Sequence, residues 1–418
     1  MTKATLQWQP TATLGRLATV CLIALFVAVV SGHGNLMVLA APALLWLAAF
    51  ARPRVPDKVA FKATCDPQRC REGQQIAVEL AVKAPSPAAR VRATCAAAGR
   101  RRPDMQVDPD ADVHRWRWMV PVGSWGRRSL ASGAITVHAQ GDLWAAVVDM
   151  RWPKVSVLPE PPQTQRTIQS AILRLRPGTR AGNVVGPGIE AAGVRPYAPG
   201  DLVRRVNWRA TMRRGQLHVT EFAAEQAQDV VLVVDAMVRT GPAGNGPVDR
   251  AVRGAAGLAE AHLDSGDRVG MVTVEPAQSW LLPGVGRRHL SMLLDRLIDL
   301  GTLDSVLPPD LSRIPPAVVP TGALVVVLTP LLTEESVGLV GDLRRRGHPV
   351  VVVDVLSGEP VPTSHGSDRS ALRLWRLDRK ATIGALQDRG VLVVEWPVER
   401  QLDAALQAAG HGRSAVLR

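Results

Sequence analysis

The sequence predicts an α/β protein with a doubly wound sheet, preceded by a two-helix transmembrane hairpin and a small antiparallel β-sandwich. Three observations carry this prediction. Two uncharged apolar runs lie near the amino terminus, short alternating runs fill residues 55–160, and continuous apolar runs alternate with amphipathic ones from residue 229 onward. At 418 residues the chain can form several domains. We expect four regions, at residues 1–54, 55–160, 161–228 and 229–418.

The two apolar runs cover residues 17–30 and 36–50 and are separated by the short sequence SGHGN. Each is slightly shorter than the ~20 residues that span a bilayer, but flanking residues extend them, so lipid contact is expected within residues 14–51. A cleaved signal peptide is the alternative, although cleavage after the first run would leave the second. Cationic residues flank the pair and the connecting loop has only His33, so the positive-inside rule places both ends in the cytoplasm.

The charge is strongly basic, with a formal net charge of +13 and only six lysines among 50 cationic residues. A GC-rich genome would produce this arginine bias without any functional cause. The functional alternatives are attraction to anionic lipid, nucleic acid or an acidic protein. The four cysteines are expected to be free thiols in a reducing cytoplasm, because no second Cys or His pair accompanies the sequence CDPQRC of residues 65–70.

The region after the apolar runs has the pattern of short strands. Residues 74–82 alternate apolar and polar side chains, and residues 114–122 do the same with Trp116 and Trp118 on one face. Several such runs with turn residues between them are typical of a β-sandwich. We expect both tryptophans to lie in its core. Prolines within residues 158–163 mark the end of this region.

The carboxyl-terminal region alternates strands and helices. Residues 229–237 form a continuous apolar run, as in a strand buried on both faces of a parallel sheet. Residues 248–267 have the spacing of an amphipathic helix. Further strands are predicted at 268–274, 323–329, 348–356 and 390–397, and further helices at 287–301 and 333–347. The apolar positions of the helix at 248–267 are Val252, Ala255, Ala256, Ala259 and Leu263.

Ligands of open α/β sheets bind beyond the carboxyl ends of the strands, where Asp235 ends the first strand. The sequence contains no GxxxxGK[ST], HExxH or GxSxG motif, and no GxGxxG follows that strand. We therefore assign no catalytic residue and expect no enzyme activity. The alternative is a hydrolase whose active site lies around Asp235 and residues 241–246. A pocket lined by two or more carboxylates with shifted pKa values would favour that alternative.

The stretch from Gly193 to Val219 is rich in arginine and contains the only tyrosine. Pro199 and Gly200 predict a turn, and Asp201 is placed to cap a helix over residues 202–213. On such a helix three arginines spaced by four residues share a face, and Arg204 lies one turn from Trp208. These three arginines are Arg205, Arg209 and Arg213.

This stretch has three possible roles. Trp208 can fill a core against the sheet while the arginines pair with local acids, or the arginines can form a docking face for an acidic protein surface. Nucleic acid is not expected, since the stretch has a single tryptophan and no fold typical of RNA or DNA binding.

The stretch also carries a motif of the form R-x-Y-x-x-G-D-x-x-R-x-x-x-W. With it, the chain resembles the bacterial "domain of unknown function fifty-eight" family, and its carboxyl-terminal region resembles a von Willebrand factor A domain. The resemblance implies a multi-pass protein of the bacterial cell membrane that acts as an adaptor. It also implies a MoxR-type AAA+ ATPase as partner, in envelope assembly, maturation or stress response. The motif positions are Arg195, Tyr197, Gly200, Asp201, Arg204 and Trp208, followed by Ala210 and Arg213.

The von Willebrand factor A domains that bind a metal carry Asp-x-Ser-x-Ser after the first strand. Here Asp235 is followed by Met237 and Arg239 at the two hydroxyl positions. Because Mg²⁺ needs several oxygen ligands, we expect neither a metal nor another cofactor. Asp235 is instead expected to pair with Arg239 or with a backbone donor.

Overall fold

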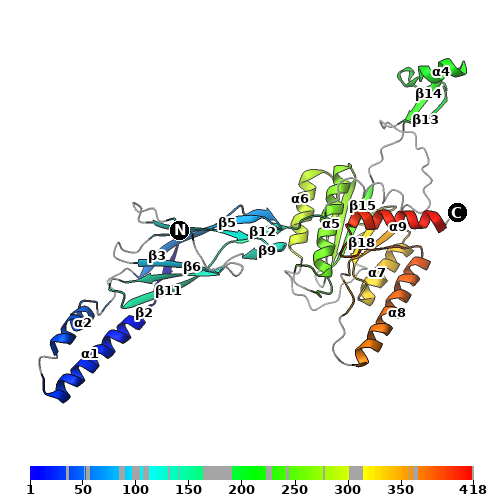
Figure 1. Ribbon diagram of the computed structural model, residues 1–418. Coiled ribbons are helices and arrows are strands. Elements are labelled where there is room, and N and C mark those ends of the chain that lie inside the picture. The colour runs from blue at the N-terminus through cyan, green and yellow to red at the C-terminus, as the bar shows by residue number, and fades with distance from the viewer. Residues whose placement is uncertain are drawn as a thin grey trace. The chain divides into compact units, whose positions relative to one another are not determined.

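The computed structural model describes residues 1–33, 37–50, 52, 57–83, 90–96, 104–106, 113–129, 132–139, 141–162, 191–222, 228–241, 244–275, 278–300, 314–356, 358–360 and 366–416. Within these residues the chain forms two compact units, Met1–Glu160 and Pro161–Arg418 (Figure 1). Each unit has a hydrophobic core of its own.

The first unit consists of short, mostly antiparallel strands around one core. One sheet has the order β1-β3-β5-β8-β7, a second the order β2-β11-β10-β6 and a third the order β4-β12-β9. The strands are β1 (Thr2–Thr5), β2 (Trp8–Pro10), β3 (Lys58–Asp66), β4 (Arg69–Arg71), β5 (Gln75–Lys83), β6 (Arg90–Ala96), β7 (Asp104–Gln106), β8 (Val113–Pro121), β9 (Gly126–Ser129), β10 (Ser132–His138), β11 (Trp144–Arg151) and β12 (Lys154–Leu158).

The alternating runs predicted at 74–82 and 114–122 form the neighbouring strands β5 and β8. Along β8 the residues alternate between buried and exposed. Trp116 and Trp118 are on the buried side and belong to the core, which confirms their predicted place. Trp118 packs edge-on against Trp152, with ring centroids 5.8 Å apart. Cys65 and Cys70 are free and buried in the same core.

The strands β1 and β2 come before the first helix and were not predicted. β1 pairs with β3, with Thr2 opposite Phe61, and β2 pairs with β11, with Trp8 opposite Ala146. The residues before the first helix therefore belong to the same sheets as strands that follow the second helix.

The helices α1 (Ala12–Ser31) and α2 (Met37–Ala49) lie between β2 and β3 and contact each other. Of the helices in the described residues, α1 alone is long and apolar enough to cross a membrane. α2 coincides with the second predicted run, but its 13 residues extend for about 20 Å, short of the ~30 Å hydrocarbon core. Helix length therefore supports one candidate span and not the predicted pair.

Both outer ends of this helix pair are attached to one loop of the first unit. The backbone N–H of Thr11, just before α1, donates to the Leu143 carbonyl over 2.9 Å, and its hydroxyl donates to the Asp142 carbonyl over 2.7 Å. Near the end of α2, the indole of Trp46 donates to the Gly141 carbonyl over 3.1 Å. The loop at residues 141–143 thus holds the start of α1 and the end of α2 together.

The second unit contains a mixed six-stranded sheet of order β17-β16-β15-β18-β19-β20, in which only β17 is antiparallel to its neighbour. Its strands are β15 (Asp229–Asp235), β16 (Arg268–Val274), β17 (Ser279–Gly284), β18 (Leu324–Thr329), β19 (Val350–Asp354) and β20 (Leu392–Glu395). Its helices are α5 (Pro247–Asp264), α6 (Gly286–Ile298), α7 (Glu334–Arg345), α8 (Gly366–Asp388) and α9 (Leu402–Val416). The unit also contains a separate two-stranded sheet of β13 (Ala191–Pro196) and β14 (His218–Phe222).

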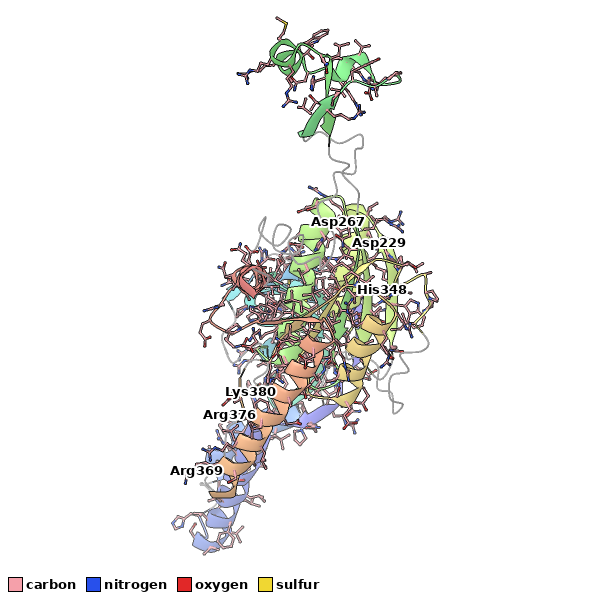
Figure 2. The ribbon with its side chains drawn as sticks, turned by 90° about the vertical axis from the view of Figure 1, so that its right-hand side faces the viewer. Asp229, Asp267, His348, Arg369, Arg376 and Lys380 are labelled. Atoms are coloured by element: carbon pink, nitrogen blue, oxygen red, sulfur yellow. The ribbon has the colours of Figure 1, made fainter. Side chains whose placement is uncertain are left out.

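Helices cover both faces of the six-stranded sheet, which confirms the α/β class. α5 contacts β15, β16 and β18 on one face, and α6 contacts α5. α7 contacts β18 and β19 on the other face, while α8 contacts α7 and β20 (Figure 1). The apolar positions predicted for the helix at 248–267 are all buried in α5. α8 was not predicted from the sequence, and its exposed residues include Arg369, Arg376 and Lys380 (Figure 2).

Candidate functional site

The carboxyl ends of four parallel strands bring polar side chains into one row. β15 ends at Asp235, β18 at Thr329, β19 at Asp354 and β20 at Glu395. Thr329 is opposite Asp354 in the sheet, and Asp354 is opposite Glu395. The Thr329 hydroxyl donates to the Asp235 carboxylate over 2.7 Å and so connects the end of β15 to the other three. This is the edge at which open α/β sheets bind ligands.

The Asp235 end of the row is closed. Asp235 is 3% exposed. Its Oδ1 accepts the backbone N–H of Met237 at 3.0 Å, and its Oδ2 accepts hydroxyl protons from Thr329 at 2.7 Å and Ser336 at 2.6 Å. These donors satisfy a buried carboxylate that would otherwise be costly. Asp235 therefore links β15 to β18 and α7.

The two partners predicted for Asp235 have different outcomes. The backbone donor is confirmed, whereas Arg239 is wrong as a partner because its guanidinium donates to the Leu300 carbonyl over 3.1 Å. Met237 is partly buried against the core of this unit. No group of three or more His, Cys, Asp or Glu side chains suited to a metal occurs within the described ranges. The absence of a metal stays a prediction.

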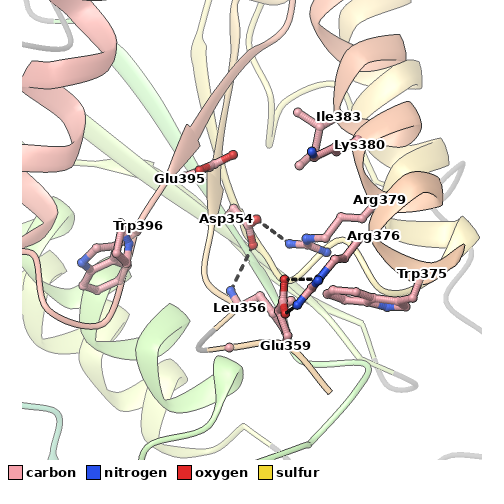
Figure 3. A pocket seen from close by; sticks show the side chains of 12 residues that line it. Asp354, Leu356, Glu359, Trp375, Arg376, Arg379, Lys380, Ile383, Glu395 and Trp396 are labelled. Carbon is pink, nitrogen blue, oxygen red and sulfur yellow. Dashed lines mark hydrogen bonds and ion pairs between the residues drawn. The ribbon is translucent and has the colours of Figure 1, made fainter. Parts of the chain in front are cut away.

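The Asp354 end of the row borders a cavity, although Asp354 itself is only 7% exposed. A cavity of about 390 Å³ lies between the ends of β19 and β20 and the helix α8 (Figure 3). Asp354 Oδ1 accepts the backbone N–H of Leu356 at 3.0 Å, and its Oδ2 forms an ion pair with Arg379. Arg379 also donates to the Pro330 carbonyl over 2.9 Å. Arg379 thereby ties α8 to the loops that follow β18 and β19.

The electrostatics of this cavity are distinct from those of a solvated surface. Burial raises the pKa of Asp354, and the like charge of Glu395 adds to the rise, although the charge of Arg379 opposes it. At the outer wall Glu359 forms a two-point ion pair with Arg376, which lowers the pKa of this carboxyl. Two carboxyl groups with shifted pKa values, Asp354 and Glu359, thus line the cavity at the end of β19, whereas the alternative active site was expected around Asp235 at the end of β15.

The arginine-rich stretch forms a small structure that we call the signature hairpin, residues 191–222. Its antiparallel strands β13 and β14 pair Arg195 with Val219. Between them lie the 3-10 helix η2 (Val203–Arg205) and the α-helix α4 (Trp208–Arg214). The backbone N–H of Tyr197 donates to the Leu217 carbonyl over 2.8 Å, which connects the two ends of the segment between β13 and β14.

The turn of the motif has a clear physical basis. Gly200 adopts a φ of 103°, a left-handed conformation that side chains disfavour. The Arg195 guanidinium donates two hydrogen bonds of 2.7 Å to the Asp201 carboxylate, which also accepts the backbone N–H of Ala198 at 2.8 Å. These contacts lower the pKa of Asp201 to about 2. Arg195, Gly200 and Asp201 therefore act together to hold the turn.

The predicted helix over residues 202–213 is wrong in its start and its cap. The chain leaves helical geometry at Val206, whose backbone pairs with Val219, and α4 begins only at Trp208. Asn207 caps α4, since its side chain accepts the backbone N–H of Ala210 at 3.0 Å. Asp201 instead holds the turn. The helix is interrupted because Val206 pairs with Val219 of β14. This contact is between residues distant in the sequence, so local capping residues do not predict it.

The predicted arginine row is divided by this break. Arg209 and Arg213 are one turn apart on α4 and exposed, whereas Arg205 lies in η2 and is half-buried. Trp208 is 62% exposed, so its predicted place in a core is wrong. No cation–π contact joins it to Arg204 among the residues that the structure describes, whereas Arg250 and Arg379 each lie over a tryptophan ring.

The comparisons with known proteins agree with the motif. Residues 193–361 match the family described as "Protein of unknown function DUF58". Over this region the chain is similar to the DUF58 family. Uncharacterized proteins of Mycobacterium bovis and Mycobacterium tuberculosis are 30% identical to the chain over 182 residues, which is 43% of this chain and 51% of each relative. The match thus spans about half the length of these relatives.

The DUF58 region divides the carboxyl edge of the sheet. It contains the signature hairpin, Asp235 and Asp354, but it ends before α8 and β20. The other wall of the cavity, with Arg379, Lys380 and Glu395, therefore comes from outside the region that matches the family.

The residues around Asp354 were not predicted from the sequence. One signal was available, because residues 350–354 read VVVVD and end a buried strand in Asp, as residues 229–235 do. No sequence signal pointed to Arg379, which is 25 residues further along the chain.

Proposed function

We propose that this protein is a membrane-anchored interaction protein that binds an acidic partner through the signature hairpin. The observation that supports this proposal is the surface of α4. Trp208 and Met212 are one turn apart and are 62% and 84% exposed, beside the exposed Arg209 and Arg213. An apolar row next to a basic row is suited to a protein surface that is acidic with apolar patches, since Trp and Arg dominate many interface energies.

The basic part of this surface is available for a partner. Arg204, Arg209, Arg213 and Arg214 are exposed, and none has an ion pair within the described part of the chain. A second arginine set, Arg195 and Arg205, is turned to Asp201 and stabilises the turn. The hairpin thus uses some arginines for its own structure and presents others.

By resemblance to the family, we propose a MoxR-type AAA+ ATPase as the partner, in envelope assembly, maturation or stress response. The second unit would then be a von Willebrand factor A-like domain that works without a metal. Its mostly parallel sheet, with Asp235 at the end of the first strand and helices on both faces, supports that comparison.

The alternative is a hydrolase with its active site around Asp235. The geometry supports this less well, because the carboxylate is buried and three donors occupy its oxygens. A catalytic carboxylate must reach substrate, and a residue that links three elements of the fold cannot move to do so.

The partner proposal can be tested by affinity capture of the detergent-solubilised protein from its native host. Wild type is expected to capture an AAA+ ATPase, and R209E/R213E is expected to lose it. The matched control is R369E/R373E, which makes the same charge change on α8 and should capture the ATPase as wild type does. Capture of no ATPase by wild type, or equal capture by all three proteins, would contradict the proposal. With purified components, the wild-type affinity should fall as salt concentration rises.

We further propose that α1 and α2 anchor the chain as a pair that enters and leaves the membrane on the cytoplasmic side. The pairing of β1 with β3 and of β2 with β11 supports this topology, because one sheet cannot have strands on both sides of a bilayer. A single crossing by α1 would separate those strands. The short α2, together with its flanking residues, would have to bring the chain back across the membrane to the cytoplasmic side.

The topology has a direct test in cysteine labelling of right-side-out and inside-out vesicles. Lys3→Cys in β1 and Lys154→Cys in β12 place exposed thiols before and after the helix pair. Both should react with an impermeant reagent in inside-out vesicles only, above the background of wild type. Reaction of the two positions from opposite sides would refute the paired anchor.

A further inference from the structure

We propose that the cavity beside Asp354 binds a small zwitterionic molecule of amino-acid or dipeptide size. Its ammonium group would lie at Asp354 and Glu395, and its carboxylate at Lys380. This inference goes beyond the proposed function, because it concerns the carboxyl edge of the sheet and does not depend on the signature hairpin or on any protein partner.

The first argument is the balance of charge around the cavity. Three carboxylates and three cationic groups line it, and two ion pairs, Asp354 with Arg379 and Glu359 with Arg376, account for four of them. Glu395 and Lys380 remain, and neither has an ion-pair partner among the described residues. A ligand with a single charge would match one and leave the other unmatched, whereas a zwitterion matches both.

The second argument is position. Glu395 ends β20 and Lys380 is on α8, so the two unpaired charges come from opposite walls of the cavity, with the Asp354–Arg379 pair between those elements (Figure 3). A ligand that spans the cavity can therefore contact one charge at each end.

The carboxylate wall favours a cation. Asp354 and Glu395 are opposite each other in adjacent parallel strands, and their like charges repel. The Arg379 guanidinium forms an ion pair with Asp354. An ammonium group bound between the two carboxylates would offset the repulsion.

The α8 wall favours an anion. Lys380 lies one turn beyond Arg376 on the same side of the helix (Figure 2). Arg376 is held by the two-point contact with Glu359, whereas the Lys380 ammonium is a mobile point charge on a flexible stem. Lys380 is therefore the cation that can turn to a ligand carboxylate without breaking an existing pair.

The third argument is size and polarity. A volume of about 390 Å³ is at the small end of the range for ligand pockets and suits an amino acid or a dipeptide better than a nucleotide or a long peptide. Five apolar side chains also line the cavity and can contact a ligand's hydrocarbon part. The apolar lining residues are Leu356, Trp375, Ile383, Trp396 and Pro397.

The test is isothermal titration calorimetry of the full-length protein in detergent. The probes are leucine, phenylalanine and L-alanyl-L-alanine, together with the N-acetyl, carboxamide and doubly blocked forms of each. At least one free zwitterion should bind with a Kd of about 1 mM or tighter. Each single block should weaken binding of that probe by about fivefold, as expected for one partly exposed charge contact, and the double block should abolish it.

Two substitutions then assign the ends of the ligand. Glu395→Gln should weaken the free zwitterion about fivefold and leave the N-acetyl form unaffected, since that form has no ammonium to lose. Lys380→Gln should show the reverse pattern, with the carboxamide form unaffected. The matched controls are Glu335→Gln on α7 and Lys154→Gln on β12, which remove exposed charges away from the cavity and should bind as wild type does.

Three results would overturn the proposal. The first is no heat of binding from any free zwitterion. The second is equal affinity for free and blocked probes. The third is loss of affinity in the controls as large as in Glu395→Gln and Lys380→Gln. None of these results bears on ATPase capture by the signature hairpin, so the two proposals fail independently.

Discussion

Two aspartates at one edge of the sheet have opposite surroundings. Asp235 and Asp354 each end a buried strand made almost entirely of valine and leucine, and each accepts the backbone N–H of the residue two positions later. Asp235 is then closed in by the hydroxyl groups of Thr329 and Ser336. Asp354 is paired with Arg379 and opens to the cavity.

The difference shows that the length of the partner side chain decides whether the end of a strand is closed by packing or is left beside a cavity. A hydroxyl group reaches only a short distance, so Thr329 and Ser336 must bring β18 and α7 close to Asp235. Arg379 reaches further, so α8 can pair with Asp354 and still leave room beside it. We therefore expect substitutions at Asp235 to act on folding and substitutions around Asp354 to act more on binding.

The largest effect is expected from Asp235→Ala. It leaves two buried hydroxyl groups and one backbone N–H without their acceptor, at a cost of about 3 kcal/mol in unfolding free energy. Hydrogen exchange during urea unfolding of the full chain, followed at the amides of β15 and β18, measures this cost. The control Asp378→Ala, at an exposed position on α8, should change stability by less than about 0.5 kcal/mol. An equally small effect of Asp235→Ala would mean that Asp235 is not a structural link.

Arg379→Met should have the next largest effect. It removes the partner of Asp354 and a donor to the Pro330 carbonyl, but the cavity lets water reach the freed groups. We expect a loss of about 2 kcal/mol, below the cost for a fully enclosed pair. The measurement is hydrogen exchange at the amides of β19 and β20. Arg373→Met, at an exposed position on the same helix, is the control, and a similar loss in both proteins would contradict a special role for Arg379.

The buried strands and the position of Asp235 at the end of one of them could be predicted from the sequence. Continuous apolar runs identified the buried strands, and the rule that ligands bind beyond carboxyl ends directed attention to Asp235. With Met237 and Arg239 at the hydroxyl positions, Asp235 was expected to pair with Arg239 or with a backbone donor, and the structure shows the backbone donor. These predictions succeed because they depend on local pattern and on the general geometry of parallel sheets.

The rest depends on contacts between residues distant in the sequence. Ser336 meets Asp235 across 101 positions, and Thr2 meets Phe61 through a sheet that local alternation cannot assign. The cap of α4 has a similar cause. Asp201 and Asn207 are both good caps by residue type. The pairing of Val206 with Val219 decides between them, because it interrupts the helix between the two.

A smaller effect is expected from Asp354→Asn. Because burial raises the pKa of Asp354, the folded protein holds the proton more tightly than the unfolded chain does. Ionised Asp354 therefore costs stability at neutral pH, and asparagine, which resembles the protonated form, should change the unfolding free energy at pH 7 by less than about 1 kcal/mol.

The raised pKa of Asp354 determines whether stability rises or falls with pH. The stability that Asp354 contributes is fully present below its ordinary pKa of 3.8 and is lost as the pH rises through its higher folded-state pKa. Urea unfolding at several pH values, compared between wild type and Asp354→Asn, should show the wild type gaining relative stability as the pH falls from 7. A relative gain on raising the pH would contradict the assigned direction.

The smallest and most local effect is expected at Asp201, which extends the comparison to a half-buried carboxylate outside the six-stranded sheet. Its pKa is lowered to about 2, first by the hydrogen bonds from Arg195 and then by the backbone N–H of Ala198. The sign is opposite to that of Asp354. Its contribution is fully present above 3.8 and is lost as the pH falls through about 2.

The turn of the signature hairpin should therefore persist at a pH where a free aspartate is largely protonated. The carboxyl carbon shift of Asp201, followed by NMR, should titrate near 2 in wild type and move toward 3.8 in Arg195→Gln. Arg204→Gln, which removes a neighbouring exposed charge without touching Asp201, should leave the midpoint close to that of wild type. A wild-type midpoint near 3.8 would mean that Arg195 and Asp201 do not hold the turn, and the arginines of the hairpin would then all be available to a partner.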